Sequence, residues 1–514
     1  MTGICAMLAA GTLQFRCPME RIDSMEPSKS QSTYDARAVA LVYETPLEID
    51  SSSRPYRLVP GLCELPKVSA DGLVYTFRMV EDAALTSRDV KRAIDTLRDP
   101  EKPSPGRWTV KMVEDVAAPD DATLRIRLSG RQHVFPWMMT MPCCAATAPD
   151  GSGTGPYRLE SWWRNHEMVF VRNPSWRGWA RTAAADAAAG LRPYDEIRYR
   201  VVDDATTAWL MFLKGELDWM GTIQRDNRDA AIGPDGKAAP ALAAAGKALY
   251  GGDPGIEIRY IGMNMDDPVL GRNRKLRQAL CCAFDFPSWS AFWNGAILRA
   301  DGPVPPGVEG CSPRPSPYRY DPEKAKRLLA EAGYPDGIDA ATGRRLTLTL
   351  SIGRPSQESR EAGELVAGFF AACGIRLELD FLTWESFLGA VTRGDAQMFM
   401  MAWVGDYPDA ENFLQLFHSS RTSPGPNHAR YRNPEYDAEY DAAMASPDAA
   451  SRNAHWRRCQ DILQEDCPWI FTHVSRNYSM IAADAENYFP GDFPYGFEKH
   501  LRTRRRAGED GGKR

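Results

Sequence analysis

The segments LTLTL (346–350), IRLELD (375–380) and MFMMAW (398–403) decide the fold of the carboxyl-terminal half. The first two alternate apolar and polar residues and the third is apolar, and both patterns are typical of strands. Between them the sequence predicts helices over 356–373 and 384–392. Gly374 and Gly394 follow these helices, as expected for glycines that close helices in the left-handed conformation. Alternation of strand and helix predicts a parallel α/β lobe.

The run GDYPDAENFL (405–414) follows the third of these strands and carries two carboxylates, Asp406 and Asp409. Ligands of open α/β sheets bind at the carboxyl ends of the strands, so an acidic loop there is suited to holding a cationic group. Asp409 directly precedes a predicted helix over 410–417 and is expected to cap it. Asp406 has two interpretations at this point: a contact to a ligand cation, or a cap of the same helix.

Further elements extend this lobe toward the amino terminus. A strand is predicted over 258–265 and a helix over 273–284. Another helix begins with Asp321 as its N-cap and ends at Gly333. The proline-rich stretch 303–317 is expected to cross the surface without regular structure. The lobe is therefore predicted to span residues 258–469.

The amino-terminal half has a different pattern of short strands and few helices. At 514 residues the chain is too long for one hydrophobic core, so two or three lobes are expected. The stretches 180–190 and 230–252 are rich in alanine and glycine and are interpreted as surface insertions. The predicted strands cover 74–78, 156–159, 168–171, 197–202 and 216–220, and the predicted helices cover 87–97 and 206–214.

Composition excludes several classes of function. A net charge of −6 gives no basic surface for nucleic acid, and no run of about 18 apolar residues predicts a membrane-spanning helix. The eleven cysteines include no C-x-x-C pair and predict no disulfide framework. With seven histidines, no H-x-x-x-H and no G-x-S-x-G, the chain is predicted not to be an enzyme. No metal site or cofactor is expected.

Several motifs occur in the order found in one known family. They are LVYETPLEID (41–50), DGLVYTFRM (71–79), GTGPYRLESW (153–162), LKGELDWM (213–220), DPEKAKRLLAEAGYPDG (321–337), the run at 405–414 and NHARYRNPEYD (427–437). Together they resemble the extracytoplasmic solute-binding proteins of peptide/nickel-type ABC importers. The resemblance implies a periplasmic-binding-protein-like α/β fold with two main lobes, a ligand cleft between them and an inserted third lobe.

The resemblance also implies where the lobes lie in the sequence. The first lobe would be discontinuous, with residues 1–50, 151–257 and 470–514. An inserted second lobe would occupy 51–150, and the parallel lobe at 258–469 would close over the ligand. The chain would act as a monomer in the periplasm or another extracytoplasmic space, although the apolar segment 4–15 lacks the basic residues of a convincing signal peptide.

By the same resemblance, the chain captures a small peptide through its main chain, as a strand is added to a sheet edge, and delivers it to a membrane permease with its ATPase subunits. Contact with the membrane would occur only through the permease. Asp406 would hold the α-ammonium of the peptide. Trp403, Gly405 and Tyr407 surround Asp406 in the matching run and are further candidates.

Two more candidates have structural alternatives. Tyr431 would border the cleft, although a turn at Asn433 and Pro434 explains it as well. Of Trp162 and Trp163, adjacent on a strand, one is expected to stack on the ligand and the other to pack inside a lobe. Two other functions remain open: a receptor for a non-peptide solute such as a metal chelate or an oligosaccharide, and a cytoplasmic ligand-sensing module without transport.

Overall fold

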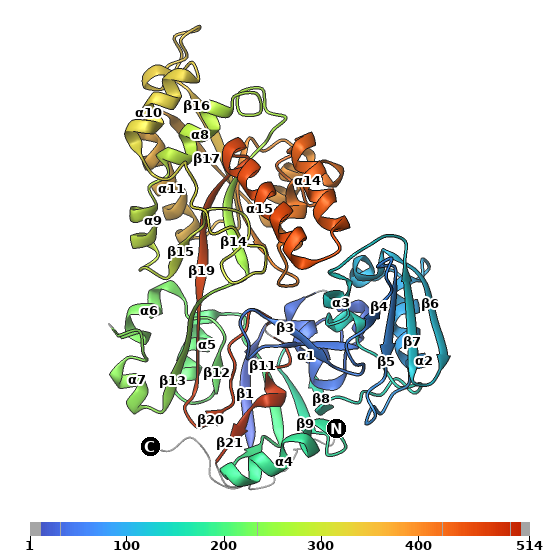
Figure 1. Cartoon of the computed structure of the whole chain (residues 1–514). Coiled ribbons are helices and arrows are strands. Elements are labelled where there is room, and N and C mark those ends of the chain that lie inside the picture. The colour runs from blue at the N-terminus through green and yellow to red at the C-terminus, as the bar shows by residue number, and fades with distance from the viewer. Residues whose placement is uncertain (1–11, 31, 234, 424, 494, 505–514) are drawn as a thin grey trace. The chain divides into compact units, whose positions relative to one another are not determined.

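The structure is a computed structural model that describes residues 12–30, 32–233, 235–423, 425–493 and 495–504 (Figure 1). The chain forms two compact units. Unit 1 contains the described parts of Met1–Gly251 and Tyr478–Arg514, and unit 2 is Gly252–Asn477. Most of the segment 4–15, which was considered as an export signal, lies outside the described residues. Within the described ranges, no helix has the length and apolar character needed to cross a membrane.

Unit 2 is built on a mixed sheet. Its strands follow the order β19 (Trp469–Ala482), β14 (Glu257–Met263), β18 (Met398–Val404), β16 (Thr347–Gly353) and β17 (Arg376–Leu382), and β15 (Ile297–Arg299) pairs with β19. The pairs β16–β17 and β16–β18 are parallel, which confirms the pairing predicted from the alternation of strands and helices. β14 is antiparallel to both of its neighbours. β14 is the first strand that lies wholly in unit 2, and the chain returns to unit 1 within β19.

Three predicted helices of unit 2 begin or end at the expected residues. Ser356 caps α11 with a capping box, Asp321 caps α10, and Gly394 ends α12 at φ 83°. The proline-rich stretch 303–317 forms no helix or strand. The helices are α8 (Arg274–Ala283), α9 (Phe286–Phe292), α10 (Pro322–Glu331), α11 (Gln357–Ala371), α12 (Trp384–Arg393), α13 (Ala410–Leu414), α14 (Pro434–Ala445) and α15 (Ala449–Asp466). The buried faces of α8, α10 and α11 form one core with β14 and β16.

Unit 1 contains two larger sheets. The first has the order β1 (Gln14–Met19), β11 (Glu196–Val201), β9 (Glu167–Arg172) and β8 (Tyr157–Trp163), with β1 parallel to β11. The second has the order β4 (Lys67–Val68), β5 (Val74–Arg78), β7 (Thr123–Leu128) and β6 (Val113–Asp120), and α2 (Ser87–Arg98) packs against it. A two-stranded sheet joins β2 (Leu47–Asp50) and β3 (Arg57–Pro60).

The remaining elements of unit 1 are short. They are α1 (Thr33–Val42), α3 (Phe135–Met138), α4 (Arg177–Ala189), β10 (Arg192–Pro193), α5 (Ala205–Leu213), β12 (Trp219–Met220), α6 (Arg225–Ala231), α7 (Pro240–Ala244), β13 (Lys247–Pro254), β20 (Ala485–Glu486) and β21 (Arg502–Thr503). The chain passes from one unit to the other within β13 and within β19. All cysteines among the described residues have free thiols.

The two alanine- and glycine-rich stretches, interpreted as surface insertions, contain regular structure. The first is most of α4, a helix with no buried residue, and the second contains α7 and much of β13, which pairs with β19. Alanine has the highest intrinsic helix propensity, so an alanine-rich stretch forms a surface helix without an apolar stripe. Gly190 ends α4 at φ 67°.

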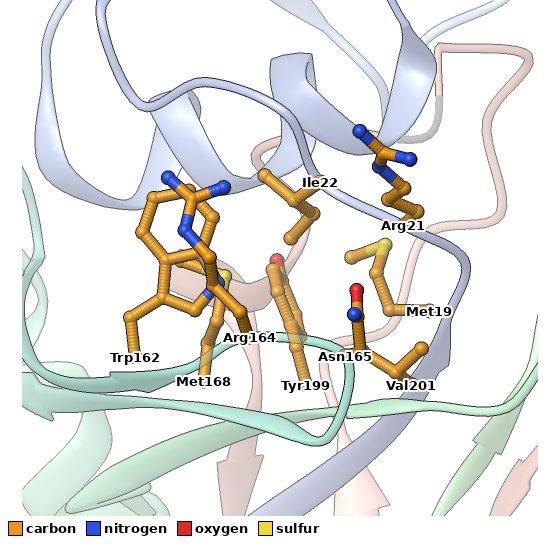
Figure 2. A pocket seen from close by; sticks show the side chains of 9 residues that line it. All are labelled: Met19, Arg21, Ile22, Trp162, Arg164, Asn165, Met168, Tyr199 and Val201. Atoms are coloured by element: carbon orange, nitrogen blue, oxygen red, sulfur yellow. The ribbon is translucent and has the colours of Figure 1, made fainter.

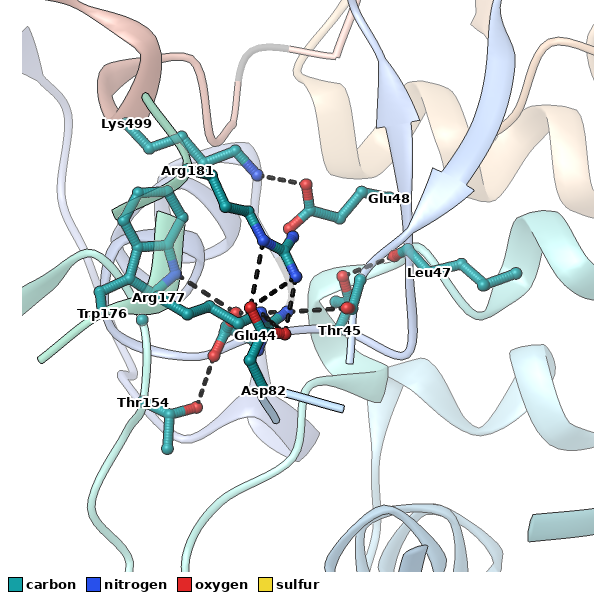
Figure 3. A network of polar contacts seen from close by, with 12 residues as sticks. Glu44, Thr45, Leu47, Glu48, Asp82, Thr154, Trp176, Arg177, Arg181 and Lys499 are labelled. Carbon is teal, nitrogen blue, oxygen red and sulfur yellow. Dashed lines mark hydrogen bonds and ion pairs between the residues drawn. The ribbon is translucent and has the colours of Figure 1, made fainter. Parts of the chain in front are cut away.

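A partly buried polar network ties α4 to other segments of unit 1 (Figure 3). The guanidinium of Arg177 lies 3.0 Å from the carboxylate of Glu44, which also accepts hydrogen bonds from Thr154 at 2.8 Å and from the indole of Trp176 at 3.2 Å. One turn further along α4, Arg181 pairs with Asp82 at 2.7 Å. The network therefore joins α4 to three other parts of the sequence inside this unit.

Candidate ligand-binding site

The loop 405–409 directly follows β18. The last residues of β18 extend beyond the end of its parallel neighbour β16. β16 pairs only with Met398, Phe399 and Met400 of β18. Residues 401–404 pair with β14 on the other side, so among the described residues their second edge has no strand partner. Val404, at the end of this free edge, is 59% exposed although it is apolar. The site thus combines an unpaired strand edge, an exposed apolar side chain and an acidic loop.

A buried amide, Asn412 of α13, holds the polar groups of this loop together. Its side-chain oxygen accepts hydrogen bonds from the indole of Trp403 at 2.8 Å and from the backbone N–H of Asp406 at 3.2 Å. Its amide nitrogen donates to the carboxyl of Asp406 at 3.4 Å. The structure therefore brings Trp403 and Asp406 together, as the sequence predicted, and does so through a residue that the sequence analysis did not single out.

Asp406 is half-buried, and no cation among the described residues pairs with it. Burial raises the pKa of its carboxyl above the ordinary 3.8 of an aspartic acid; the hydrogen bond from Asn412 lowers the pKa, and the nearby charge of Glu411 raises it. A carboxylate that loses water contacts without gaining a cation is less stable in its charged form. A ligand ammonium would supply the missing charge.

Gly405 and Tyr407 have structural roles in the loop. A Cβ added to Gly405 would lie 2.9 Å from the ring of Phe413 and 3.1 Å from the carbonyl oxygen of Ile256, so only glycine allows this close approach. The side chain of Tyr407 is buried at 2% exposure and donates its hydroxyl to Glu411, which also accepts from Tyr440 at 2.5 Å. Both residues hold the backbone that carries Asp406.

Asp409 is the N-cap of α13, as predicted, and accepts a hydrogen bond from the backbone N–H of Glu411 at 2.9 Å. The cap function is therefore assigned to Asp409, and Asp406 does not cap the helix. α13 ends at Leu414 and is followed by a 3-10 turn over Gln415–Phe417, which is a tighter end than the single helix expected over 410–417.

Tyr431 lies among other residues of unit 2. Its hydroxyl donates to Asp466 at 2.6 Å, its side chain is 3% exposed, and its ring packs edge-on against Phe417 and Tyr436. Asn433, the other residue of the predicted turn, caps α14 and also donates to Asp466, at 2.9 Å. The role of Tyr431 seen here is structural, but Asn433 and Pro434 start a helix and do not form the turn that was expected as the alternative.

Trp162 lines a pocket of about 210 Å³ in unit 1, whereas Trp163 is 68% exposed (Figure 2). The pocket lies at the carboxyl ends of the parallel strands β1 and β11, whose last residues, Met19 and Val201, line it. Arg164 places its guanidinium over the Trp162 ring, 4.3 Å from the ring centroid. The other lining residues are Arg21, Ile22, Asn165, Met168 and Tyr199.

Asn412 has a sequence signal that is weak without a structure. An asparagine inside a short helix just after an acidic loop is unusual, since asparagine favours caps and turns. We expect Asn412→Ala to lower the free energy of unfolding by about 1–3 kcal/mol, because the indole of Trp403 and the N–H of Asp406 lose their acceptor. Urea denaturation would measure this change.

The matched control is Asn453→Ala, which removes an exposed hydrogen bond donated by the Asn453 amide to the carboxylate of Glu309 at 3.0 Å and should change the stability by less than about 0.5 kcal/mol. If Asn412→Ala is as stable as the control, Asn412 does not organise the loop.

The site and fold define a class of protein. The model of the bacterial extracellular solute-binding proteins, family 5, matches residues 57–425. The chain belongs to this family. Membership confirms the fold and the family predicted from the motifs, supports solute binding for transport over a cytoplasmic sensor, and points to a role other than catalysis.

Individual proteins similar to the chain are named for different ligands. Heme-binding protein A of Haemophilus influenzae is 24% identical over 478 residues, which cover 85% of this chain and 82% of that protein. Glutathione-binding protein GsiB of Pectobacterium atrosepticum is 24% identical over 524 residues and covers 96% and 93%. The periplasmic binding protein DppA from Helicobacter pylori, solved with the peptide STSA, has the same fold with a TM-score of 0.75 at 19% identity, covering 96% and 98%.

Proposed function

We propose that the chain is the substrate-binding component of a peptide-type ABC transporter and that it captures a small peptide by its amino terminus. The observation that carries the proposal is the half-buried carboxylate of Asp406, which has no partner cation among the described residues. An α-ammonium bound there would form a charge-assisted hydrogen bond, which is roughly twice as strong as a neutral one.

The free edge of β18 supports a peptide over other amines. An extended peptide can pair its main chain with residues 401–404, as in recognition by strand addition. Its amino terminus would then lie near Asp406, and its first side chains near Trp403 and Val404. The names of the relatives include a binder of glutathione, itself a tripeptide, and a structural neighbour holds a four-residue peptide.

The proposed function places the chain in the periplasm or an equivalent extracytoplasmic space, where it acts as a monomer and delivers its ligand to a permease and the ATPase subunits. The extracellular character of the family supports this location. A ligand that binds one conformation of the chain more tightly than another shifts the population toward that conformation.

The test is calorimetry with a free tripeptide and the same tripeptide acetylated at its amino terminus. Acetylation removes the positive charge and leaves the main chain intact, so we expect it to weaken binding by about tenfold or more. The control is the same tripeptide amidated at its carboxyl terminus, which should bind almost as tightly as the free tripeptide. Equal affinities of the free and acetylated peptides would show that Asp406 does not bind an α-ammonium.

A further inference from the structure

The pocket around Trp162 contains an arginine whose charge has no partner. The Arg164 guanidinium lies over the face of the Trp162 ring and forms no ion pair with the described residues. Arginines on the neighbouring strands are paired: Arg172 with Asp195 at 3.3 Å, Arg198 with Glu196 at 2.8 Å and Arg200 with Glu167 at 3.4 Å. Arg158 of β8 has no acidic partner either and donates to the side-chain oxygen of Asn173 at 2.6 Å. Arg164, an exposed residue of the turn between β8 and β9, differs from these arginines because it lines a cavity.

The second arginine of the pocket has a partner and is less suited to a ligand. Arg21 pairs with Asp23 at 2.7 Å, and both side chains are at least half exposed. Figure 2 shows the guanidinium of Arg164 beside Trp162 and that of Arg21 at the opposite end of the view, with the side chain of Ile22 between them. Of the two arginines that line this pocket, Arg164 is therefore the one whose charge is available to an anion.

The rest of the pocket is suited to a short carbon chain. The side chains of Met19, Ile22 and Met168 are at most 6% exposed, so the half-buried Val201 and the ring of Trp162 supply most of the accessible apolar lining. A cavity of about 210 Å³ is smaller than the 300 Å³ or more that a drug-sized ligand occupies, so it suits a single side chain or a small acid. Its place at the carboxyl ends of two parallel strands is the usual position of ligands in α/β sheets.

We propose that this pocket binds a carboxylate carried on a short carbon chain, with Arg164 as its ion-pair partner and Trp162 as the surface for the chain. The proposal deepens the proposed function, on which this part rests, because it makes an acidic side chain of the peptide the preferred occupant. The guanidinium, whose central carbon lies 4.3 Å from the centroid of the indole, can donate two parallel N–H groups to a carboxylate, and a charged, two-oxygen acceptor is favoured over a neutral amide.

The first experiment uses no peptide. Protein labelled with ¹⁵N at tryptophan is titrated with glutarate, and the indole N–H signal of Trp162 is assigned by its loss in Trp162→Phe. We expect a saturable shift of this signal with glutarate, none with the neutral glutaramide, and at least about tenfold weaker binding in Arg164→Gln. Arg164→Lys, which keeps the charge, should recover part of the affinity.

Arg354→Gln is the matched control, because Arg354 also lies over an indole, 4.9 Å from the centroid of Trp384 in unit 2. It should leave the titration unchanged. Equal shifts with glutarate and glutaramide, or unchanged binding in Arg164→Gln, would overturn the proposal, whatever the result with acetylated peptides.

The second experiment compares the tripeptides Ala-Glu-Ala and Ala-Gln-Ala by calorimetry. We expect the glutamate peptide to bind more tightly to the wild type and the preference to disappear in Arg164→Gln. A preference that survives in Arg164→Gln, or no preference in the wild type, would overturn the assignment of a peptide side chain to this pocket. Binding of neither peptide would contradict the proposed function, and the glutarate titration would still decide whether the pocket takes a carboxylate.

Discussion

Asp406→Asn should weaken the binding of a free tripeptide by about ten- to hundredfold, because a hydrogen bond between two charged groups contributes about 1.5–3 kcal/mol. The loop should keep its shape, because the asparagine amide has the same size as the aspartate carboxylate and its oxygen can still accept the hydrogen bond from Asn412. Calorimetry at pH 7 measures the loss. Acetylated peptide should bind the variant and the wild type equally, so that the two changes together cost no more than either alone.

Asp406→Asn should weaken ligand binding but should not destabilise the ligand-free protein. The pKa of Asp406 is raised in the folded protein, so the folded state binds the proton more tightly than the unfolded state does. The charged carboxylate therefore destabilises the ligand-free protein at neutral pH, and this destabilisation disappears as the pH falls through the raised pKa. We expect Asp406→Asn to leave the melting temperature at pH 7 unchanged or to raise it.

The pH dependence of binding follows from the same shift. Affinity for the free peptide should be full at neutral pH and should fall as the pH decreases through the pKa of Asp406, which lies above 3.8. Asp406→Asn should remove this dependence. Asp395→Asn, at an exposed carboxylate paired with Arg393, is the control and should change neither affinity nor its pH profile. If the affinity of Asp406→Asn depends on pH as that of the wild type does, Asp406 is not the group that binds the α-ammonium.

The ends of several helices in unit 2 could be predicted because capping residues and glycines act on backbone only a few residues away. Ser356, Asp321, Gly374 and Gly394 mark helix ends through backbone geometry and capping bonds that depend only on near neighbours. The same is true of Asp409, whose cap bond reaches two residues along the chain. These features were read correctly without knowledge of the tertiary structure.

Contacts between distant residues were not predictable in this way. The sequence gives no sign that the hydroxyl of Tyr431 reaches Asp466, 35 positions later, or that the ring of Tyr407 turns inward. Both depend on how helices pack around the loop. The antiparallel pairing of β14 with β18 was missed for a similar reason, because it is set by the path of the chain between units.

A buried ion pair that joins the two ends of unit 1 carries the largest expected effect on stability. Arg37 of α1 donates to Glu498 at 2.8 Å, and their side chains are 3% and 0% exposed. Tyr199 donates to the same carboxylate at 2.7 Å, and the guanidinium lies 4.5 Å from the ring centroid of Trp219. Arg37 and Glu498 are 461 positions apart, so their ion pair forms only when the discontinuous parts of this unit assemble.

We expect Arg37→Met to lower the free energy of unfolding of unit 1 by about 3–5 kcal/mol, because it leaves the carboxylate of Glu498 buried without its cation. The methionine keeps most of the apolar contact with Trp219, so the loss reports mainly the charge. Urea denaturation followed by tryptophan fluorescence measures it. Arg127→Met, which breaks an exposed pair with Glu114 at 3.3 Å in the same unit, should cost less than about 1 kcal/mol.

The double variant Arg37→Met with Glu498→Leu distinguishes two origins of this effect. If the loss in Arg37→Met comes from the uncompensated charge, removal of the carboxylate should restore much of the stability, since apolar replacements of buried pairs are often neutral. Tyr199 would then keep a buried hydroxyl without its acceptor, so the recovery should be incomplete. A double variant no more stable than Arg37→Met would mean that packing around α1, and not the ion pair, holds the two ends of unit 1 together.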